Sequence, residues 1–178
     1  MAYRCDPMPW IEVVDEGSAE GELARVYRRV RDERGNVANI HKVQSLNPEA
    51  MDRHLSLYMT LMFGRSPLSR AERELVATGV SRYNGCGYCD KHHEEALSRY
   101  SVEITSERRE AMLGFAEKLT GRPWMVSKED VDGLRAVGFN DREILDLVLV
   151  VSYFNFVNRL VLGLGVELED EGEREYKY

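Results

Sequence analysis

Residues typical of helix caps recur along this chain. Between them lie stripes of apolar residues that repeat about every 3.6 positions, the length of one helical turn. The first stripe, within residues 19–34, has apolar side chains at positions 23, 26, 27 and 30 and is followed by a glycine. No segment alternates apolar and polar residues as a half-buried strand does. The pattern therefore predicts an all-α fold, a bundle of about seven to eight helices.

Two later helix starts are marked by strong signals. Pro48 follows Asn47, a cap followed by a first-turn proline, and Ser69 with Glu72 forms a capping box. The Asn84-Gly85 pair ends the second of these helices. The predicted helices after the first cover residues 40–46, 48–63, 69–83, 86–100, 107–119, 128–137 and 141–163.

Composition limits the organisation and the partners. With 178 residues and 43% hydrophobic content, the chain is expected to form one domain, residues 1–178, with residues 1–17 as a loose N-terminal arm and 167–178 as a frayed acidic tail. A net charge of −7 argues against binding to nucleic acid or to anionic membranes. Residues 1–10 contain no apolar stretch of signal-peptide length, so we expect a cytoplasmic protein.

The most apolar run, residues 144–164, is long enough to suggest a membrane span. Asp146, Asn158 and Arg159 interrupt it, and each central charge would cost about 2.5 to 3.5 kcal/mol in a bilayer. We therefore expect a helix buried in a core or a subunit interface. Together with the Met-rich helix at 48–63, this apolar surface predicts a homo-oligomer.

A weak internal repeat relates residues 68–89 to residues 139–160. In this register Ser69 matches Asn140 as a helix cap and Glu72 matches Glu143, but the second copy has no cysteines. The repeat includes four identities, and a chance likeness between two capped helices also explains them.

Cys86 and Cys89 form a CxxC pair, and Cys5 is the only other cysteine. In a reducing compartment such a pair is more often catalytic or metal-binding than structural. The pair lies at a predicted helix start, where free backbone N–H groups and the helix dipole stabilise a thiolate. These two thiols are therefore candidates for redox chemistry.

Two proton-carrying residues lie within reach of this pair. His93 is one helical turn beyond Cys89 on the same face. If the flanking helices fold back on each other at Gly85, Glu74 lies within one helical turn of His93. This geometry gives a candidate relay from Glu74 through His93 to Cys89.

Other interpretations of these residues remain open. Glu74 could be a surface residue paired with Arg70, and His92 is expected to be solvated. A c-type haem would need a histidine at Asp90, and a thioredoxin-like fold would need strands. Zinc could be held by Cys86, Cys89 and His93 with His92 or a residue of another chain, although no second CxxC exists.

These residues resemble a known family. Glu74, the string Ser81-Arg82-Tyr83-Asn84-Gly85-Cys86-Gly87-Tyr88-Cys89 and His93 are similar to the alkylhydroperoxidase D-like (AhpD-like) members of the carboxymuconolactone decarboxylase superfamily, especially the peroxidase-related group. A weaker likeness includes residues 131–137 and 158–165, so it extends over most of the chain beyond the first ~20 residues.

The resemblance implies an all-helical, homo-oligomeric protein that reduces hydroperoxides through its vicinal cysteines in antioxidant defence, without a bound cofactor. It implies that Cys89 attacks the peroxide, that Cys86 is the proton donor and resolving thiol, and that Glu74 and His93 relay the proton. An external dithiol, such as a lipoyl protein, would restore the thiols, and a peroxiredoxin would be a partner. The chain departs from the family pattern at Tyr88, where founding members have a histidine. Because a phenol of pKa about 10 is a poor base near neutrality, His93 would have to suffice or the peroxidase activity would be weak.

Two alternatives remain beside the peroxidase. One is a thiol-disulfide oxidoreductase with no preference for peroxides. The other is a non-enzymatic helical assembly module whose CxxC pair binds zinc or senses redox state.

Overall fold

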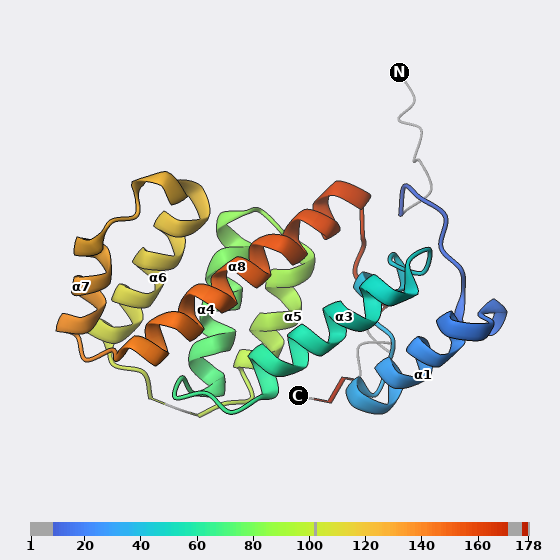
Figure 1. Cartoon of the computed structure of the whole chain (residues 1–178), viewed down its shortest axis with the longest axis horizontal. Helices are drawn as coiled ribbons and strands as arrows, with labels where there is room; N and C mark the ends of the chain where they lie inside the picture. The colour runs from blue at the N-terminus through green and yellow to red at the C-terminus, as the bar shows by residue number, and fades with distance from the viewer. Residues whose placement is uncertain (1–8, 102, 171–175, 178) are drawn as a thin grey trace, which may run out of the picture. The chain divides into compact units, whose positions relative to one another are not determined.

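A computed structural model of the chain describes residues 9–101, 103–170 and 176–177. These residues form eight α-helices, two 3₁₀ helices and one π-helical turn, with no strand among them. Figure 1 shows how the helices follow one another along the chain. The all-α prediction is confirmed. The α-helices are α1 (Gly21–Arg34), α2 (Asn39–Lys42), α3 (Pro48–Tyr58), α4 (Arg70–Tyr83), α5 (Gly87–Leu97), α6 (Ser106–Gly121), α7 (Lys128–Ala136) and α8 (Asp141–Leu164). The shorter elements are η1 (Glu16–Ser18), η2 (Met59–Phe63, the π turn) and η3 (Pro123–Met125).

The structure differs from the prediction of one helix over residues 48–63. The α-helix α3 ends at Tyr58 and continues as the π turn η2. A π turn breaks the regular backbone ladder, so nearby carbonyls need other donors. Arg70 donates to the Met62 carbonyl at 2.6 Å, and Arg73 donates to the Leu61 and Gly64 carbonyls at 2.9 and 3.1 Å. The two arginines at the start of α4 thus hold the turn that precedes it.

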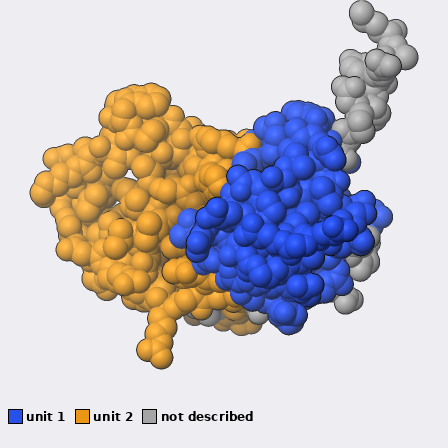
Figure 2. Space-filling view, turned by 45° about the vertical axis from the view of Figure 1, so that its right-hand side comes forward, with its two compact units in different colours: residues 1–57, 160–178 blue, residues 58–159 orange. Residues whose placement is uncertain are grey.

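The chain groups into two compact units, drawn in two colours in Figure 2. Unit 1 comprises residues 1–57 and 160–178, and unit 2 comprises residues 58–159. The one-domain organisation remains a prediction.

Both ends of the chain contribute to unit 1. The Trp10 N–H donates to the Leu164 carbonyl at 3.0 Å, and the Lys177 N–H donates to the Arg34 carbonyl at 2.8 Å. Glu169 is buried and accepts a hydrogen bond from the backbone N–H of Asn39 at 2.6 Å. The expectation of a frayed tail is therefore wrong for its described residues, because a hydrogen-bonded, buried carboxylate fixes the chain there. Cys5 and the start of the predicted arm lie outside the described residues.

Unit 1 contains two buried histidines to which the sequence assigned no role. The rings of His41 and His54 stack with centroids 5.6 Å apart, and His54 Nδ1 lies 2.8 Å from the side-chain amide of Gln44. Burial lowers the pKa of His54 to about 4. His54 is thus neutral in the folded protein at neutral pH.

We expect acid to destabilise the protein through His54. The folded pKa lies below the unfolded value near 6.5, so this stability is fully present above pH 6.5 and is lost as the pH falls toward 4, by at most about 3 kcal/mol. Urea unfolding of wild type and His54→Gln at pH 7 and pH 4.5 measures this loss. The variant should lose about 2 kcal/mol less than wild type over this range, and equal losses would show that His54 does not carry the effect.

Unit 2 contains η2, α4 to α7 with η3, and residues 141–159 of α8. Its core forms where the apolar stripes of these helices meet, as their spacing predicts. The fully buried apolar side chains of this unit include Leu75, Val76, Ala77 and Val80 of α4, Met112 and Ala116 of α6, Leu134 of α7, and Leu147, Val150, Val151 and Phe154 of α8.

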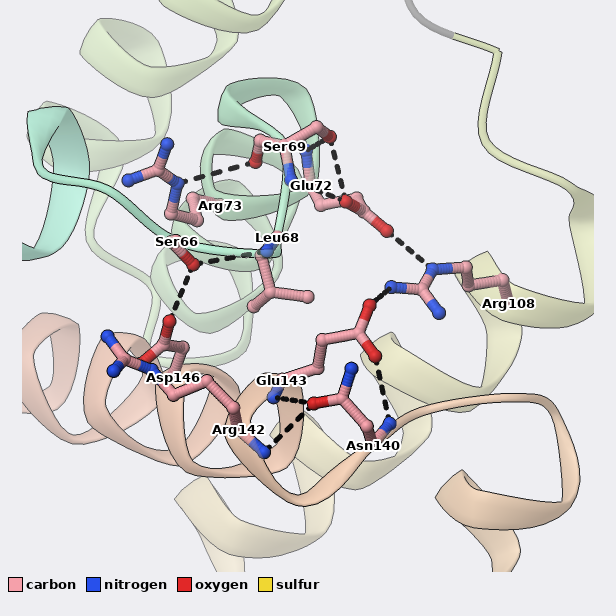
Figure 3. Close-up of polar contacts among 10 residues, drawn as sticks. All are labelled: Ser66, Leu68, Ser69, Glu72, Arg73, Arg108, Asn140, Arg142, Glu143 and Asp146. Carbon is pink, nitrogen blue, oxygen red and sulfur yellow. Dashed lines mark hydrogen bonds and ion pairs between the residues drawn. The ribbon is translucent and has the colours of Figure 1, made fainter.

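The two copies of the proposed repeat meet in unit 2, as Figure 3 shows. Glu72 accepts from the Ser69 N–H at 2.7 Å, and Glu143 accepts from the Asn140 N–H at 2.8 Å, so both helices begin with the same reciprocal cap. Arg108 of α6 lies between them and donates to Glu72 at 2.5 Å and to Glu143 at 2.7 Å. These matched caps support the repeat.

Polar residues of α8 within unit 2 are buried with partners. Asp146 accepts from Ser66 at 2.6 Å and from Arg142 at 2.9 Å. By length and composition alone α8 could cross a membrane, and it is the one such helix among the described residues. Buried, hydrogen-bonded polar side chains are instead typical of a core helix.

Candidate thiol site

The turn between α4 and α5 positions the site. Gly85 has φ +67°, in the left-handed region that glycine adopts without strain, and no other described residue of the turn has positive φ. The Cys86 N–H then donates to the Ser81 carbonyl at 2.8 Å. Because Cys86 is also the N-cap of α5, the turn brings the start of α5 back onto the end of α4.

Glu74 and His93 are brought into direct contact by this turn. His93 Nδ1 lies 2.6 Å from Glu74 Oε2, although 19 residues separate them. The Glu74 side chain is completely buried and that of His93 is 11% exposed. With Nδ1–H assigned as the donor to Glu74, Nε2 is the nitrogen left to accept a proton.

Arg70 holds the other oxygen of Glu74. Its Nε donates to Glu74 Oε1 at 2.7 Å, and its guanidinium lies 3.8 Å from the centre of the Phe63 ring. Burial opposes ionisation of Glu74, but His93 and Arg70 outweigh it, so the pKa of Glu74 lies below its ordinary value. The sequence posed Arg70 and His93 as alternative partners, whereas the carboxylate binds both.

The two thiols are buried and unequal. Cys86 is 1% exposed and Cys89 is 2% exposed, and both are free. Hydrogen bonds from the Cys89 thiol and backbone N–H lower the pKa of Cys86 against the effect of burial. The pKa of Cys89 is raised well above its ordinary value by the hydrogen bond with Cys86 and by burial. The hydrogen bond within the pair thus favours ionisation of Cys86 over Cys89, whereas the resemblance implies that Cys89 is the attacking thiolate.

Tyr88 and His92 form a separate pair beside the cysteines. Tyr88 is 7% exposed, and its ring centroid lies 4.6 Å from that of His92. The ring of His93 instead packs edge-on against Phe154 at 4.5 Å. His92 and His93 thus point in different directions, which fits their 100° separation on a helix.

Asn158 of α8 is a site residue that sequence reasoning did not find. It is fully buried, it accepts from Asn84 Nδ2 at 2.9 Å, and it donates to Ser81 Oγ at 3.2 Å, so it binds the end of the helix that precedes the cysteines. The signal was present, because an asparagine inside an apolar run must find polar partners when buried.

The described residues contain no cluster of three or more histidine, cysteine, aspartate or glutamate side chains placed to hold a metal ion. The zinc interpretation therefore gains no support from the part of the chain that the structure describes.

Comparison with known proteins gives a consistent picture. A model of the carboxymuconolactone decarboxylase family matches residues 48–114, which include Glu74, Cys86, Cys89 and His93. Mouse Sestrin-3 is 25% identical over 148 residues, which are 76% of this chain but only 30% of Sestrin-3, so this chain spans less than a third of that relative.

Solved structures match over nearly the whole chain. An uncharacterised peroxidase-related protein from Silicibacter sp. TM1040 is 28% identical with TM-score 0.74, covering 98% of this chain and 100% of that one. The alkylhydroperoxidase AhpD core of a peroxidase-related protein from Ralstonia eutropha JMP134 has TM-score 0.81 at 24% identity, covering 96% and 99%. The debrominase Bmp8 has the same fold, with TM-score 0.73 at 19% identity, covering 92% and 96%. The fold alone therefore does not select a reaction, and the side chains of the site must.

Proposed function

We propose that this chain is an AhpD-like protein of the carboxymuconolactone decarboxylase superfamily and a thiol-dependent peroxidase that acts in antioxidant defence. The observation that carries the proposal is the buried Glu74–His93 pair, 2.6 Å apart, on the two helices that flank the CxxC turn. A buried thiol needs a base to take its proton, and an imidazole oriented by a buried carboxylate is such a group.

In the first step the Cys86 thiolate attacks the terminal oxygen of a hydroperoxide. The O–O bond breaks, the alkoxide takes up a proton and leaves as alcohol, and Cys86 becomes a sulfenic acid. The peroxide is reduced by two electrons, which the sulfur supplies.

In the second step Cys89 attacks the sulfur of that sulfenic acid. His93 takes the Cys89 proton, the S–S bond forms, and the hydroxyl group leaves as water after protonation. His93 lies four residues after Cys89 within α5, so both are on one helix face. The thiol with the raised pKa is the one that most needs a base, which is why we assign the relay to resolution.

This order of attack reverses the one that the resemblance implies. Cys86 occupies the N-cap of α5 and accepts hydrogen bonds from Cys89, the usual arrangement of the more acidic thiol in a CxxC pair. We therefore propose Cys86 as the nucleophile and Cys89 as the resolving thiol.

An external dithiol closes the cycle by reducing the disulfide in two exchange steps. A lipoyl protein is the reductant that we propose, with a peroxiredoxin as a further partner. Assembly as a homo-oligomer and a cytoplasmic location belong to the same proposal, and the mass in solution tests the first of these.

Single turnover tests the proposal. Reduced Cys5→Ser protein, which has two thiols left, is mixed with one equivalent of an organic hydroperoxide, and the remaining thiols and peroxide are counted. We expect both thiols to be lost for each peroxide consumed. In the Cys86→Ser/Cys89→Ser variant of this chain, peroxide should persist, and equal consumption there would contradict the proposal.

The Cys5→Ser protein also tests the two alternatives to a peroxidase, the thiol-disulfide oxidoreductase and the zinc-binding module. Faster oxidation by a mixed disulfide than by any peroxide would show a thiol-disulfide oxidoreductase. Stoichiometric zinc in protein purified without chelators would support the zinc module, because zinc-bound thiolates are withdrawn from redox chemistry.

A further inference from the structure

We propose that exposed aromatic and basic side chains around the turn between α4 and α5 form a docking surface for an acidic protein that carries a dithiol and reduces the disulfide of the CxxC pair. This thiol-turn surface comprises Tyr83, Arg122, Trp124 and Arg159, all of them in unit 2. The inference rests on the proposed function in one respect, because it takes that disulfide as the group that the partner reduces.

Three helices meet at the thiol-turn surface. The Tyr83 side chain occupies the space that a Cβ atom at Gly121 would need, so the end of α4 packs directly on the end of α6. Asn155 of α8 donates to Thr120 Oγ1 at 2.9 Å and accepts from Asn84 Nδ2 at 3.1 Å. The ends of α4 and α6 and this part of α8 therefore lie together, and the cysteine pair begins two residues after Asn84.

Two aromatic side chains of this surface are exposed to solvent. Tyr83 is 48% exposed, and Trp124, three residues beyond Gly121 in η3, is 75% exposed. Covering such rings with a partner recovers the free energy of apolar burial. Tryptophan, tyrosine and arginine are also the residue types that most often dominate the binding free energy at protein interfaces. The two rings are therefore suited to anchor a partner beside the thiols.

Two arginines supply the charge of the surface. Arg159 Nη1 donates to the carbonyl and to Oδ1 of Asn155 at 2.7 and 2.8 Å, and both of these acceptors are neutral. Arg122 is exposed and follows Gly121 directly. Neither guanidinium pairs with a carboxylate among the described residues, so both charges remain available to a partner.

The charge near the thiols has the opposite sign to that of the whole chain. Arg82, on the same turn, pairs with Asp90 at 2.9 Å and with Glu94 at 2.7 Å. Together with Arg122 and Arg159, these side chains carry a net positive charge, whereas the chain as a whole carries −7. At 0.1 M salt, charges more than about 10 Å away are largely screened. Complementary charge raises the rate of association, so an acidic partner is favoured over a basic one.

Reduction of the disulfide by the docked partner takes two exchange steps. A thiolate of the partner attacks one sulfur of the disulfide, so a mixed disulfide forms and the other sulfur leaves as a thiolate and takes up a proton. The second thiol of the partner then attacks the mixed disulfide, and the partner leaves with a disulfide of its own. Overall the partner gives two electrons and two protons, and both thiols of this chain are restored.

Two dithiol peptides of opposite charge test the docking surface. Each contains a CxxC sequence, flanked by glutamates in one peptide and by lysines in the other, and each reduces Cys5→Ser protein whose disulfide has been formed with diamide. Each rate is divided by the rate of the same peptide with neutral 2,2′-dithiodipyridine, which removes the difference in thiol acidity. At 0.1 M salt we expect the glutamate peptide to react about tenfold faster, and at 1 M salt the two rates should agree within about twofold. Equal rates at 0.1 M salt, or a faster lysine peptide, would overturn the proposal.

Charge reversal locates the effect on the molecule. Arg122→Glu should reduce the preference for the glutamate peptide at least about threefold, and Arg159→Glu should change it in the same direction. Arg109→Glu is the matched control, because Arg109 is also exposed on α6 but lies about 20 Å from Arg122 along the helix. It should change the preference by less than about 1.5-fold. An equal loss in Arg109→Glu would show that only the net charge matters and would overturn the proposal.

The fluorescence of Trp124 tests the place of binding without any substitution in the surface. In a Cys5→Ser/Trp10→Phe chain, Trp124 is the remaining tryptophan. Its emission should shift when the oxidised protein is titrated with a glutamate peptide whose cysteines are replaced by serines. An emission that does not move at concentrations that saturate the reduction rate would overturn the proposal.

A second copy of this chain is the competing occupant of the surface. Protection of Trp124 from acrylamide quenching before any peptide is added would show that another copy covers the ring, and this result would also overturn the proposal. Because none of these measurements uses peroxide, failure of the peroxidase assay would leave the inference standing, and the reverse is also true.

Discussion

The Cys89→Ser variant, in a Cys5→Ser chain, is expected to react with one equivalent of hydroperoxide at pH 7 and to stop at a sulfenic acid on Cys86. Cys86→Ser in the same chain should react about tenfold more slowly, because burial still raises the pKa of the remaining Cys89 thiol. Trapping with a 1,3-diketone and mass spectrometry locates the sulfenic acid. The Cys5→Ser parent forms the disulfide, so it should give little of the diketone adduct.

The opposite pattern would restore the order that the resemblance implies. If Cys86→Ser consumes peroxide rapidly and Cys89→Ser does not, then Cys89 is the nucleophile and Cys86 resolves. Rapid loss of peroxide in both variants would mean that neither thiol is needed.

Replacing Glu74 with glutamine should lower the stability of the fold and slow the resolving step, in which the disulfide forms. The carboxylate lies between Arg70 and His93 with its side chain completely buried, so the neutral amide leaves the Arg70 charge without its partner. We expect a loss of about 3 kcal/mol in the free energy of unfolding, typical of a broken buried ion pair. We also expect about a hundredfold slower disulfide formation after the sulfenic acid has formed, because His93 loses its orienting carboxylate.

Glu94→Gln is the control for this change. Glu94 is also on this hairpin, but its side chain is 55% exposed and it pairs with Arg82 at 2.7 Å, so the same loss of charge should cost less than about 1 kcal/mol. Urea unfolding and rapid-mixing kinetics on both variants give the comparison. If Glu74→Gln behaves like Glu94→Gln, the buried pair has no special role.

Much of the fold followed from local signals in the sequence. The caps and apolar stripes predicted α1 and α4 to α8 closely, because those signals act within a few residues of each helix end. The Asn84-Gly85 stop also led correctly to a hairpin in which Glu74 reaches His93. The π turn η2 was not predicted. Its carbonyls accept hydrogen bonds from Arg70 and Arg73 of the following helix, which no local signal indicates.

The remaining site residues depend on packing between distant segments. Asn158 reaches Asn84 across 74 positions, and no spacing rule connects them. The order in which the two thiols react stays a prediction, because the acidity of each sulfur depends on a hydrogen bond between them that no sequence spacing reveals. The sequence identifies the pair, and the trapping experiment assigns the two roles.

Arg108 has a consequence for how this molecule can change over evolutionary time. It is the common partner of Glu72 and Glu143, one from each copy of the repeat, so the two helix starts form one electrostatic unit. A substitution at either glutamate removes one of the two carboxylates that hold the guanidinium, so its effect reaches the other helix start through Arg108. The start of the helix without cysteines is therefore coupled to the start of the helix that leads to the cysteine pair, because both bind the same arginine.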